Sequence, residues 1–475
     1  MHSRLLAAAS LLVLAAMGPV PISVMAWGAE QDATLGDQTG VAVTIYNQDL
    51  ALVRDVRTLT LSAGENDVAF VDVSGHIQPQ TALLKSASGK LDVLEQDFDF
   101  DLLTPAKLLE KSVGRMVRVI VTNPETGKET VEQAKVLSVD DGVVLQIGDR
   151  IETEVPGRIV FAEIPPDLRA RPTLITKIAS DTAGKLPVEL DYLTGGLSWA
   201  ADYVAELSPD EHSIELKGWV TLTNSSGTTY RNALLQLVAG NVNRVQSALQ
   251  DQKQKTIDVL EEAKPAPMQE QALFEYHLYT LGRPTTIADN QTKQVELLTG
   301  HSIPVTKEYR FENVAESFNE QMGEAPRVNA TVRLSFINDE KSRLGIPLPG
   351  GIVRVYKADN AGQAIFVGED SIDHTPKNET VKLSLGQAFD VTARGKQTDF
   401  EDLGSDLYES AYEIEFKNAK SQPVTITLAQ SMPGDWKVVR ESQAHEKPDA
   451  STALWHITIP AEGSAKLTYR VRVKY

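Results

Sequence analysis

Apolar and polar residues alternate with a period of two along most of the chain. The segment "GLSWAADYVAEL" places Leu197, Trp199 and Tyr203 on one face of an extended strand, and "SAKLTYRVRVKY" near the C-terminus alternates in the same way. Runs rich in Val, Thr and aromatic residues with this period are typical of half-buried β-strands. Turn-forming Gly, Asn and Pro residues separate them. The pattern predicts an all-β protein made of several β-sandwiches.

The first part of the chain divides into two predicted units. Residues 30–100 predict an N-terminal β-sandwich, and about five short apolar runs within residues 101–165 predict a small closed β-barrel. The segment "TPAKLLEK" predicts a short helix, with Thr104 at the N-cap and Pro105 at the first helical position. The proline-rich segment "EIPPDLRARP" then predicts a linker, since proline is excluded from the interior of a sheet.

The remainder, residues 170–475, predicts one or two larger β-sandwiches. "GLSWAADYVAEL" and the following run "HSIELKGWVTLT" are predicted to pair as neighbouring strands. Residues 246–272 break the alternation, because they are rich in Gln, Glu and Ala and contain few large apolar side chains. This insertion is predicted to be a surface excursion that is mostly helical or disordered.

The N-terminus has the pattern of an export signal. One Arg precedes an apolar run from Leu5 to Met17, "GPVP" interrupts any helix, and small residues near Ala26 suit a signal peptidase. We therefore predict that residues 1–26 are a cleaved signal peptide and that the protein is periplasmic or extracellular, with no stable membrane span after cleavage. The alternative is an uncleaved anchor, because no charge follows the apolar run before Glu30.

Composition narrows the chemistry. The 475 residues include no cysteine, which excludes disulfides, thiol nucleophiles and thiolate metal ligands. The formal charge of −19 and the lack of a Lys/Arg cluster argue against nucleic acid as a partner. The motifs GxxxxGK[ST], GxGxxG and HExxH do not occur, so we predict no cofactor.

The densest polar cluster is "GEDSIDHTPKNE", residues 368–379. It contains Glu369, Asp370, Asp373, His374 and Glu379. Carboxylates beside a histidine are suited to metal binding or acid–base catalysis. A turn between two strands is the favoured interpretation, because neighbouring residues of an extended chain face opposite sides and Asp, Asn and Pro favour turns. We assign no catalytic, cofactor-binding or metal residue, and retain these five side chains as a candidate binding cluster.

Several segments resemble one protein family. They are "YNQDLALVRDVRTL", "DYLTGGLSWAADYVAEL", "GWVTLTNSSGTTYRNALLQLVAGNVN", "LGIPLPGGIVRVYKAD", "GEDSIDHTPKNETVKLSLGQAFDV", "EIEFKNAK" and "LTYRVRVKY". Together they resemble the bacterial domain-of-unknown-function family DUF4139, found in mucoidy-inhibitor-like exported proteins. The resemblance implies an exported, β-rich protein, and it transfers no catalytic residue.

Two functions of different classes follow. The first is a non-catalytic cell-envelope protein, a β-sandwich module that binds or scaffolds an envelope protein or glycan. The second is an enzyme, either an envelope polysaccharide hydrolase or a metal-dependent enzyme, that uses carboxylates of residues 368–379. A glycosidase needs two carboxyl groups about 5–9.5 Å apart across a cleft. The surroundings of Asp370 and Asp373 therefore distinguish the two hypotheses.

Overall fold

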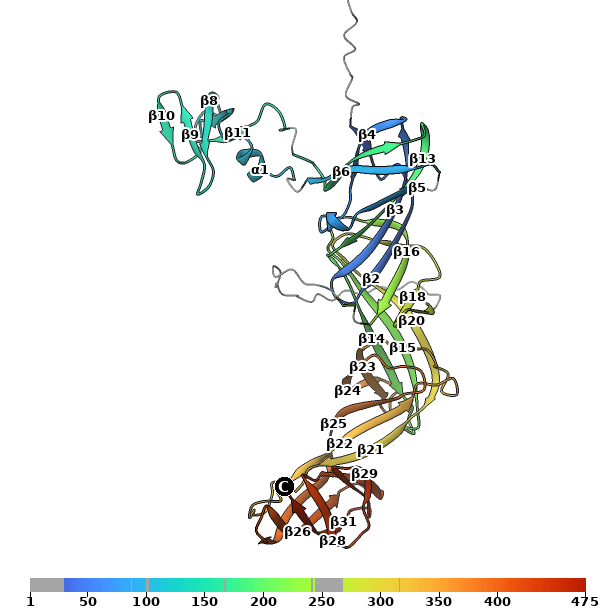
Figure 1. Ribbon diagram of the computed structural model, residues 1–475. Coiled ribbons are helices and arrows are strands. Elements are labelled where there is room, and N and C mark those ends of the chain that lie inside the picture. Colours follow the sequence, from blue (N-terminus) through green and yellow to red (C-terminus); the bar gives the residue numbers. More distant parts are fainter. Residues whose placement is uncertain are drawn as a thin grey trace, which may run out of the picture.

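The computed structural model describes residues 30–475 except residues 87, 100–101, 166–167, 241, 244–267 and 316. These residues form five β-sheets, which confirms the predicted all-β, multi-sheet fold. Figure 1 shows that most of the sheets follow one another along one long axis, while a small domain stands to one side. In the described part of the chain, no helix has the length and apolar character needed to cross a membrane.

The N-terminal sandwich consists of two sheets that share one hydrophobic core. The first sheet has the order β1 (Gln31–Ala33), β4 (Gly64–Val71), β12 (Thr173–Ser180), β6 (Leu91–Asp99). The second has the order β17 (Gln269–Leu273), β18 (Tyr276–Thr280), β16 (Tyr230–Ala239), β2 (Gln38–Tyr46), β3 (Leu50–Leu61), β13 (Gly184–Thr194), β5 (Leu83–Ser86), and β19 (Thr285–Ile287) also pairs with β16. The 3₁₀-helix η1 (Pro79–Thr81) precedes β5. Because β12 and β13 follow the small domain in sequence, strands pair across the boundary predicted between residues 100 and 170.

The small domain begins with the predicted short helix. Helix α1 (Pro105–Glu110) has Thr104 at its N-cap, whose side chain accepts the Lys107 N–H at 3.2 Å, so this prediction is confirmed. One antiparallel sheet follows, in the order β10 (Arg150–Glu152), β9 (Val144–Ile147), β8 (Glu129–Ser138), β7 (Met116–Thr122), β11 (Arg158–Val160).

The prediction of a closed barrel in this domain is wrong, because the described sheet is open, with β10 and β11 at opposite edges. Both edge strands have only three residues. Closing a barrel needs a continuous tilted ladder, which strands this short do not provide.

The middle sheet carries the candidate cluster. Its order is β20 (Gln291–Pro304), β15 (Ser213–Asn224), β14 (Leu197–Leu207), β23 (Gly351–Ala358), β24 (Ala364–Ile372). Residues 197, 199, 201, 203, 205 and 207 of β14 are all buried, and β14 pairs with β15, so the predicted face and the predicted pairing are both confirmed. This sheet shares its hydrophobic core with the N-terminal sandwich.

A nine-stranded sheet forms the C-terminal part and curls around its own hydrophobic core. Its order is β28 (Asp435–Glu441), β31 (Gly463–Lys474), β26 (Leu407–Asn418), β25 (Thr380–Asp402), β22 (Val328–Ile337), β21 (Thr306–Glu312), β27 (Val424–Ser431), β30 (Thr452–Ile459), β29 (Glu446–Asp449). Strand β25 has 23 residues, about 75 Å of extended chain. It supplies Val381 to the middle core and Val391 to the C-terminal core.

Most of the predicted insertion at residues 246–272 lies outside the described residues. Its last residues are described, and they correct the prediction. Residues 269–272 belong to β17, which pairs with β18 at the edge of the N-terminal sandwich. Short polar strands of this kind are hard to recognise from sequence, because "QEQAL" lacks the apolar alternation that marks a half-buried strand.

Candidate functional site

The candidate cluster begins inside a strand and ends in a connection. Glu369 and Asp370 belong to β24, and β25 begins at Thr380, so the predicted connection between two strands consists of residues 373–379. Strand β24 pairs antiparallel with β23 after the turn "ADNAG", residues 358–362. Consecutive residues of β24 point to opposite faces, and this separates the first two carboxylates of the cluster.

Glu369 lies on the solvent face of the middle sheet. Its carboxylate is 3.2 Å from Arg354 Nε, and Arg354 Nη1 donates to Asp202 Oδ1 at 2.9 Å. The hydrogen bond to Asp202, with the nearby negative charges, raises the pKa of Arg354. Because these side chains are partly exposed, we expect each pair to contribute at most about 1 kcal/mol. These three charged side chains join β14, β23 and β24, and the Glu369 carboxylate is bound by the protein itself.

Asp370 turns the other way and joins two sheets. Its Oδ2 accepts the Ser384 N–H of β25 at 2.7 Å, and its Oδ1 accepts the Ser371 N–H at 2.9 Å. Hydrogen bonds from backbone N–H groups to a carboxylate are stronger than neutral ones. Asp370 therefore holds β24 against β25, and both of its oxygens are in use.

His374 fixes the start of the connection. Its Nδ1 accepts the Gly350 N–H at 3.0 Å, which places the proton of the neutral ring on Nε2. Although the residue as a whole is exposed, neighbouring atoms displace water from the ring. This desolvation lowers the pKa of His374; the charge of Asp373 raises it and that of His277 lowers it further. The folded protein therefore favours the neutral form of the His374 ring.

Asn338 at the end of β22 organises the rest of the connection. Its side chain is fully buried, and Nδ2 donates to the carbonyls of Ile346 at 2.7 Å and Pro376 at 3.1 Å. Its Oδ1 accepts the Gly345 N–H at 3.2 Å. Its backbone also bonds to Asn378 and Glu379. The sequence reading missed Asn338, which lies 30 residues before the cluster and carries no local signal for this contact.

The last two candidates contribute through their backbone. The Asp373 carbonyl accepts the Thr375 hydroxyl at 2.8 Å, and the Glu379 carbonyl accepts the Asn338 N–H at 2.9 Å. The carboxylates of Asp373 and Glu379 are exposed and form no ion pair within the described chain. Nowhere among the described residues do three His, Asp or Glu side chains group to hold a metal ion. The five predicted side chains therefore share a segment without converging on one point.

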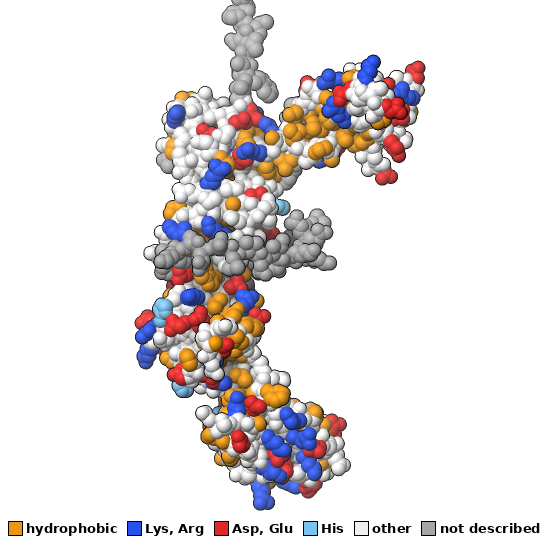
Figure 2. All heavy atoms as spheres, turned by 180° about the vertical axis from the view of Figure 1, so that it is seen from behind, with side chains coloured by type: hydrophobic (Ala, Val, Ile, Leu, Met, Phe, Trp, Pro, Cys, Tyr) orange, Lys and Arg blue, Asp and Glu red, His pale blue; other side chains and the backbone are white. Residues whose placement is uncertain are grey.

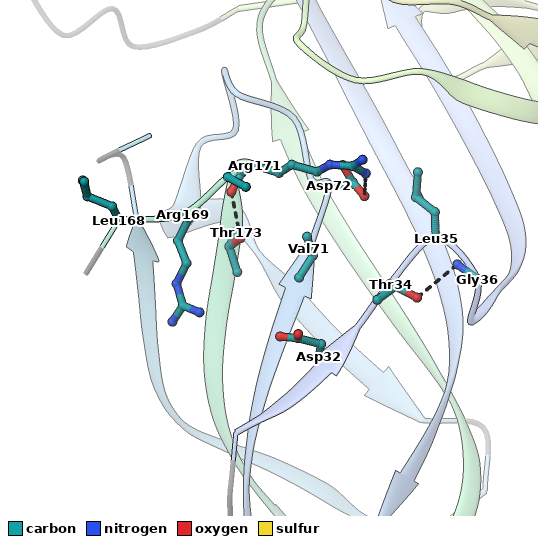
Figure 3. A pocket seen from close by; sticks show the side chains of 11 residues that line it. Asp32, Thr34, Leu35, Gly36, Val71, Asp72, Leu168, Arg169, Arg171 and Thr173 are labelled. Atoms are coloured by element: carbon teal, nitrogen blue, oxygen red, sulfur yellow. Dashed lines mark hydrogen bonds and ion pairs between the residues drawn. The ribbon is translucent and has the colours of Figure 1, made fainter. Parts of the chain in front are cut away.

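A surface hollow of about 570 Å³ lies elsewhere, at the end of the N-terminal sandwich (Figure 3). Asp32, Asp72 and Arg171 contribute polar groups to it, and Leu35 and Leu168 contribute apolar ones. Arg171 Nη1 is 2.6 Å from Asp72 Oδ2, so these two charges of the hollow are paired with each other. Another hollow lies on the small domain beside Arg150. Neither is lined by residues 368–379.

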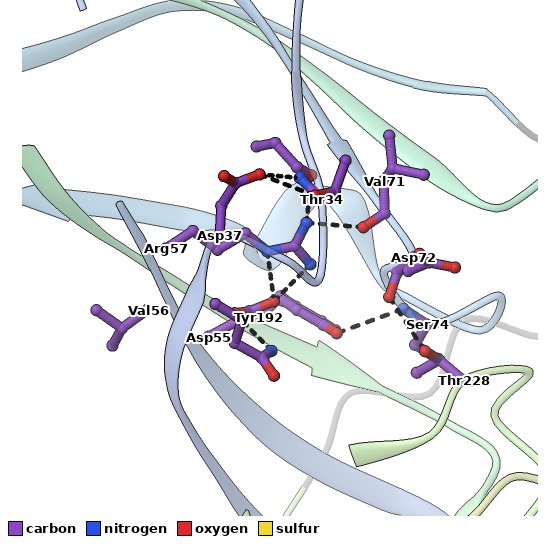
Figure 4. A network of polar contacts seen from close by, with 12 residues as sticks. Thr34, Asp37, Asp55, Val56, Arg57, Val71, Asp72, Ser74, Tyr192 and Thr228 are labelled. Atoms are coloured by element: carbon purple, nitrogen blue, oxygen red, sulfur yellow. Dashed lines mark hydrogen bonds and ion pairs between the residues drawn. The ribbon is translucent and has the colours of Figure 1, made fainter. Parts of the chain in front are cut away.

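A buried ion pair beneath the first hollow was also missed by the sequence reading. Arg57 is fully buried, and its Nη2 donates to Asp55 Oδ2 at 2.7 Å while its Nη1 donates to the carbonyls of Val71 and Ala33 (Figure 4). Gln38 donates to the other oxygen of Asp55 at 2.9 Å. A signal was present: Asp55 and Arg57 occupy the apolar phase of β3, between Val53 and Leu59.

The comparisons with known proteins bear on the region after this ion pair. A family model described as a domain of unknown function, DUF4139, matches residues 188–475, more than half of the chain. The chain belongs to this family. The resemblance seen in the sequence is thereby confirmed. A search of the curated proteins found no match.

The DUF4139 region, residues 188–475, contains the whole 368–379 connection and begins within β13. Its first strand pairs with β3 along its full length, and its strand β16 pairs with β2. The Ser74 hydroxyl donates to the Ser226 carbonyl at 3.1 Å across the same seam. The DUF4139 region is therefore joined to the N-terminal sandwich by sheet hydrogen bonds as well as by side chains.

Proposed function

We propose that this protein is an exported, non-catalytic module of the bacterial cell envelope that binds or scaffolds another envelope component. The observation that carries the proposal is the junction between the middle and C-terminal cores. Strands β22 and β25 both run through it, and each supplies buried residues to both cores. A junction made of continuous paired strands resists bending more than a loop does, which suits a module that sets the distance between its binding surfaces.

The polar chemistry of residues 368–379 supports the same proposal. Asp370, Glu369 and His374 direct their polar atoms to Ser384, Arg354 and Gly350 of the protein itself. These contacts define the path of β24 and of the connection to β25. Residues 368–379 then serve to hold β24 and β25 in position. The export pattern of residues 1–26 supports an envelope location.

Cell fractionation and crosslinking test the proposal. In native cells carrying a C-terminally tagged chain, we expect the tag in the periplasmic or extracellular fraction and a reproducible crosslinked adduct with one envelope component. A cytoplasmic chain, or no adduct under several crosslinker lengths, would count against it. Release of sugar from envelope polysaccharide by the purified chain, lost in Asp370→Asn with its melting temperature retained, would favour the hydrolase hypothesis instead.

A further inference from the structure

Strand β24 is an edge strand of the middle sheet, and half of its free edge is apolar and uncovered. The covered half begins at Gly368, where a Cβ would lie 2.2 Å from the Leu385 carbonyl oxygen of β25. The uncovered half is "AIFV", residues 364–367, in which Ile365 is 48%, Phe366 51% and Val367 39% exposed. The Phe366 ring contacts the ring of Tyr356 on the neighbouring strand edge-on. Both faces of this strand segment therefore present apolar side chains.

Two other edge strands, β28 and β29, carry features that prevent pairing with a further strand. Strand β28 has Lys437 and Arg440 on its edge and a register shift at Val439. Strand β29 contains Lys447 and Pro448. Charged residues, proline and bulges protect free edges, and a flat apolar edge without them is a template for strand addition. Residues 364–367 have no charge and no proline. Their pairing with β23 shifts register at Val367, so the missing charge and proline, and not a regular ladder, distinguish this edge.

The surrounding charge selects the kind of strand that fits. Asp359 precedes the apolar run, and Asp373 and Glu379 follow it with carboxylates that form no ion pair in the described chain. The nearest cations on β23 are already paired, Arg354 with Asp202 and Lys357 with Glu211. Carboxylates without an ion pair therefore lie before and after the run in sequence, on a chain whose formal charge is −19.

We propose that the free edge of β24 at residues 364–367 docks one extended apolar segment of a partner protein, flanked by lysine or arginine residues. This inference rests on the proposed function, since it names the partner class of the same module. The segment adds a strand beside β24, its side chains cover Phe366 and Ile365, and its flanking cations face these carboxylates. A second copy of this chain fits less well, because antiparallel pairing centred on Phe366 brings Asp359 of one copy toward Asp373 of the other.

A peptide-binding assay tests whether this edge prefers an apolar strand with cationic ends. The probe is a fluorescent peptide of alternating Val and Thr with lysines at both ends, titrated with the full chain at low salt. We expect Phe366→Asp to weaken binding at least about tenfold, and Phe366→Ser to weaken it less. Val439→Asp, an equally exposed apolar position on β28, should bind as the unchanged chain does. A matched peptide with glutamate ends should bind at least about tenfold more weakly. Equal binding of both peptides, or full binding by a folded Phe366→Asp chain, would overturn the inference.

Photocrosslinking in native cells tests the occupant. A photoreactive residue replaces Phe366 in one strain and Val439 in the control strain. We expect an adduct from position 366 that maps to an apolar segment flanked by Lys or Arg in another protein. An adduct with a second copy of this chain overturns the inference. So does the absence of an adduct at 366 when chemical crosslinking still captures a partner, a result that leaves the proposed function standing. Loss of both adducts removes the two proposals together.

Discussion

Replacing Asn338 with alanine should loosen the connection that follows β24. The side chain is fully buried and makes three hydrogen bonds of 2.7–3.2 Å, to the Ile346 and Pro376 carbonyls and from the Gly345 N–H. Alanine removes all three and leaves their backbone partners without a replacement. At a net value of about 0.5–1.5 kcal/mol each, the loss amounts to roughly 2–4 kcal/mol. The control is Asn360→Ala, an exposed turn residue, for which we expect a change within about 0.5 kcal/mol.

The assay must resolve local from global loosening, because the protein has separate hydrophobic cores that can unfold in different steps. Hydrogen exchange followed by mass spectrometry on peptides covering residues 338–348 and 373–380 reports the connection directly. We expect faster exchange in both peptides for Asn338→Ala, and unchanged exchange in the C-terminal core. Asn338→Asp should be at least as disruptive at neutral pH, since a carboxylate would face two carbonyls. Wild-type exchange and melting temperature in Asn338→Ala would refute the assigned role of this side chain.

Three further predictions concern buried charge, pH and backbone spacing. Arg57→Met should destabilise the N-terminal sandwich by about 3–5 kcal/mol, because it strands the buried Asp55 carboxylate, and adding Asp55→Leu should restore part of the loss in a thermal melt. His374 has a lowered pKa in the fold, so below pH 6.5 the unfolded chain binds a proton that the folded chain resists. Stability should therefore fall as the pH drops through this range, and His374→Gln should show a smaller fall in parallel melts. Gly351→Ala should prevent normal folding, since its Cβ would lie 2.1 Å from the Ala201 carbonyl oxygen. Gly362→Ala has free space around its Cβ and should cost only about 1 kcal/mol for its positive φ of 81°. Equal melting temperatures for these two variants would contradict the register of β14 and β23.

Local sequence determined the type of most elements, β17 being an exception. The period of two in "GLSWAADYVAEL" is sufficient to place Trp199 and Tyr203 in the core, because side chains of a strand alternate between faces. Thr104 and Pro105 mark the start of α1 for reasons that lie within one helical turn. Each of these predictions depends only on neighbours in sequence.

Tertiary structure alone decided which strands meet. The alternation of β13 does not say that it pairs with β3, more than 120 residues earlier, or that β14 pairs with β23 in parallel. The small domain was predicted to close because the number of short strands is visible in sequence, while their pairing at the edges is not. The candidate cluster shows the same limit. Adjacent residues suggested one site, whereas the strand directs Glu369 to Arg354 and Asp370 to Ser384. The decisive contact comes from Asn338, which directly follows β22. Residue type and spacing encode local conformation, but long-range partners depend on how the hydrophobic faces are buried together.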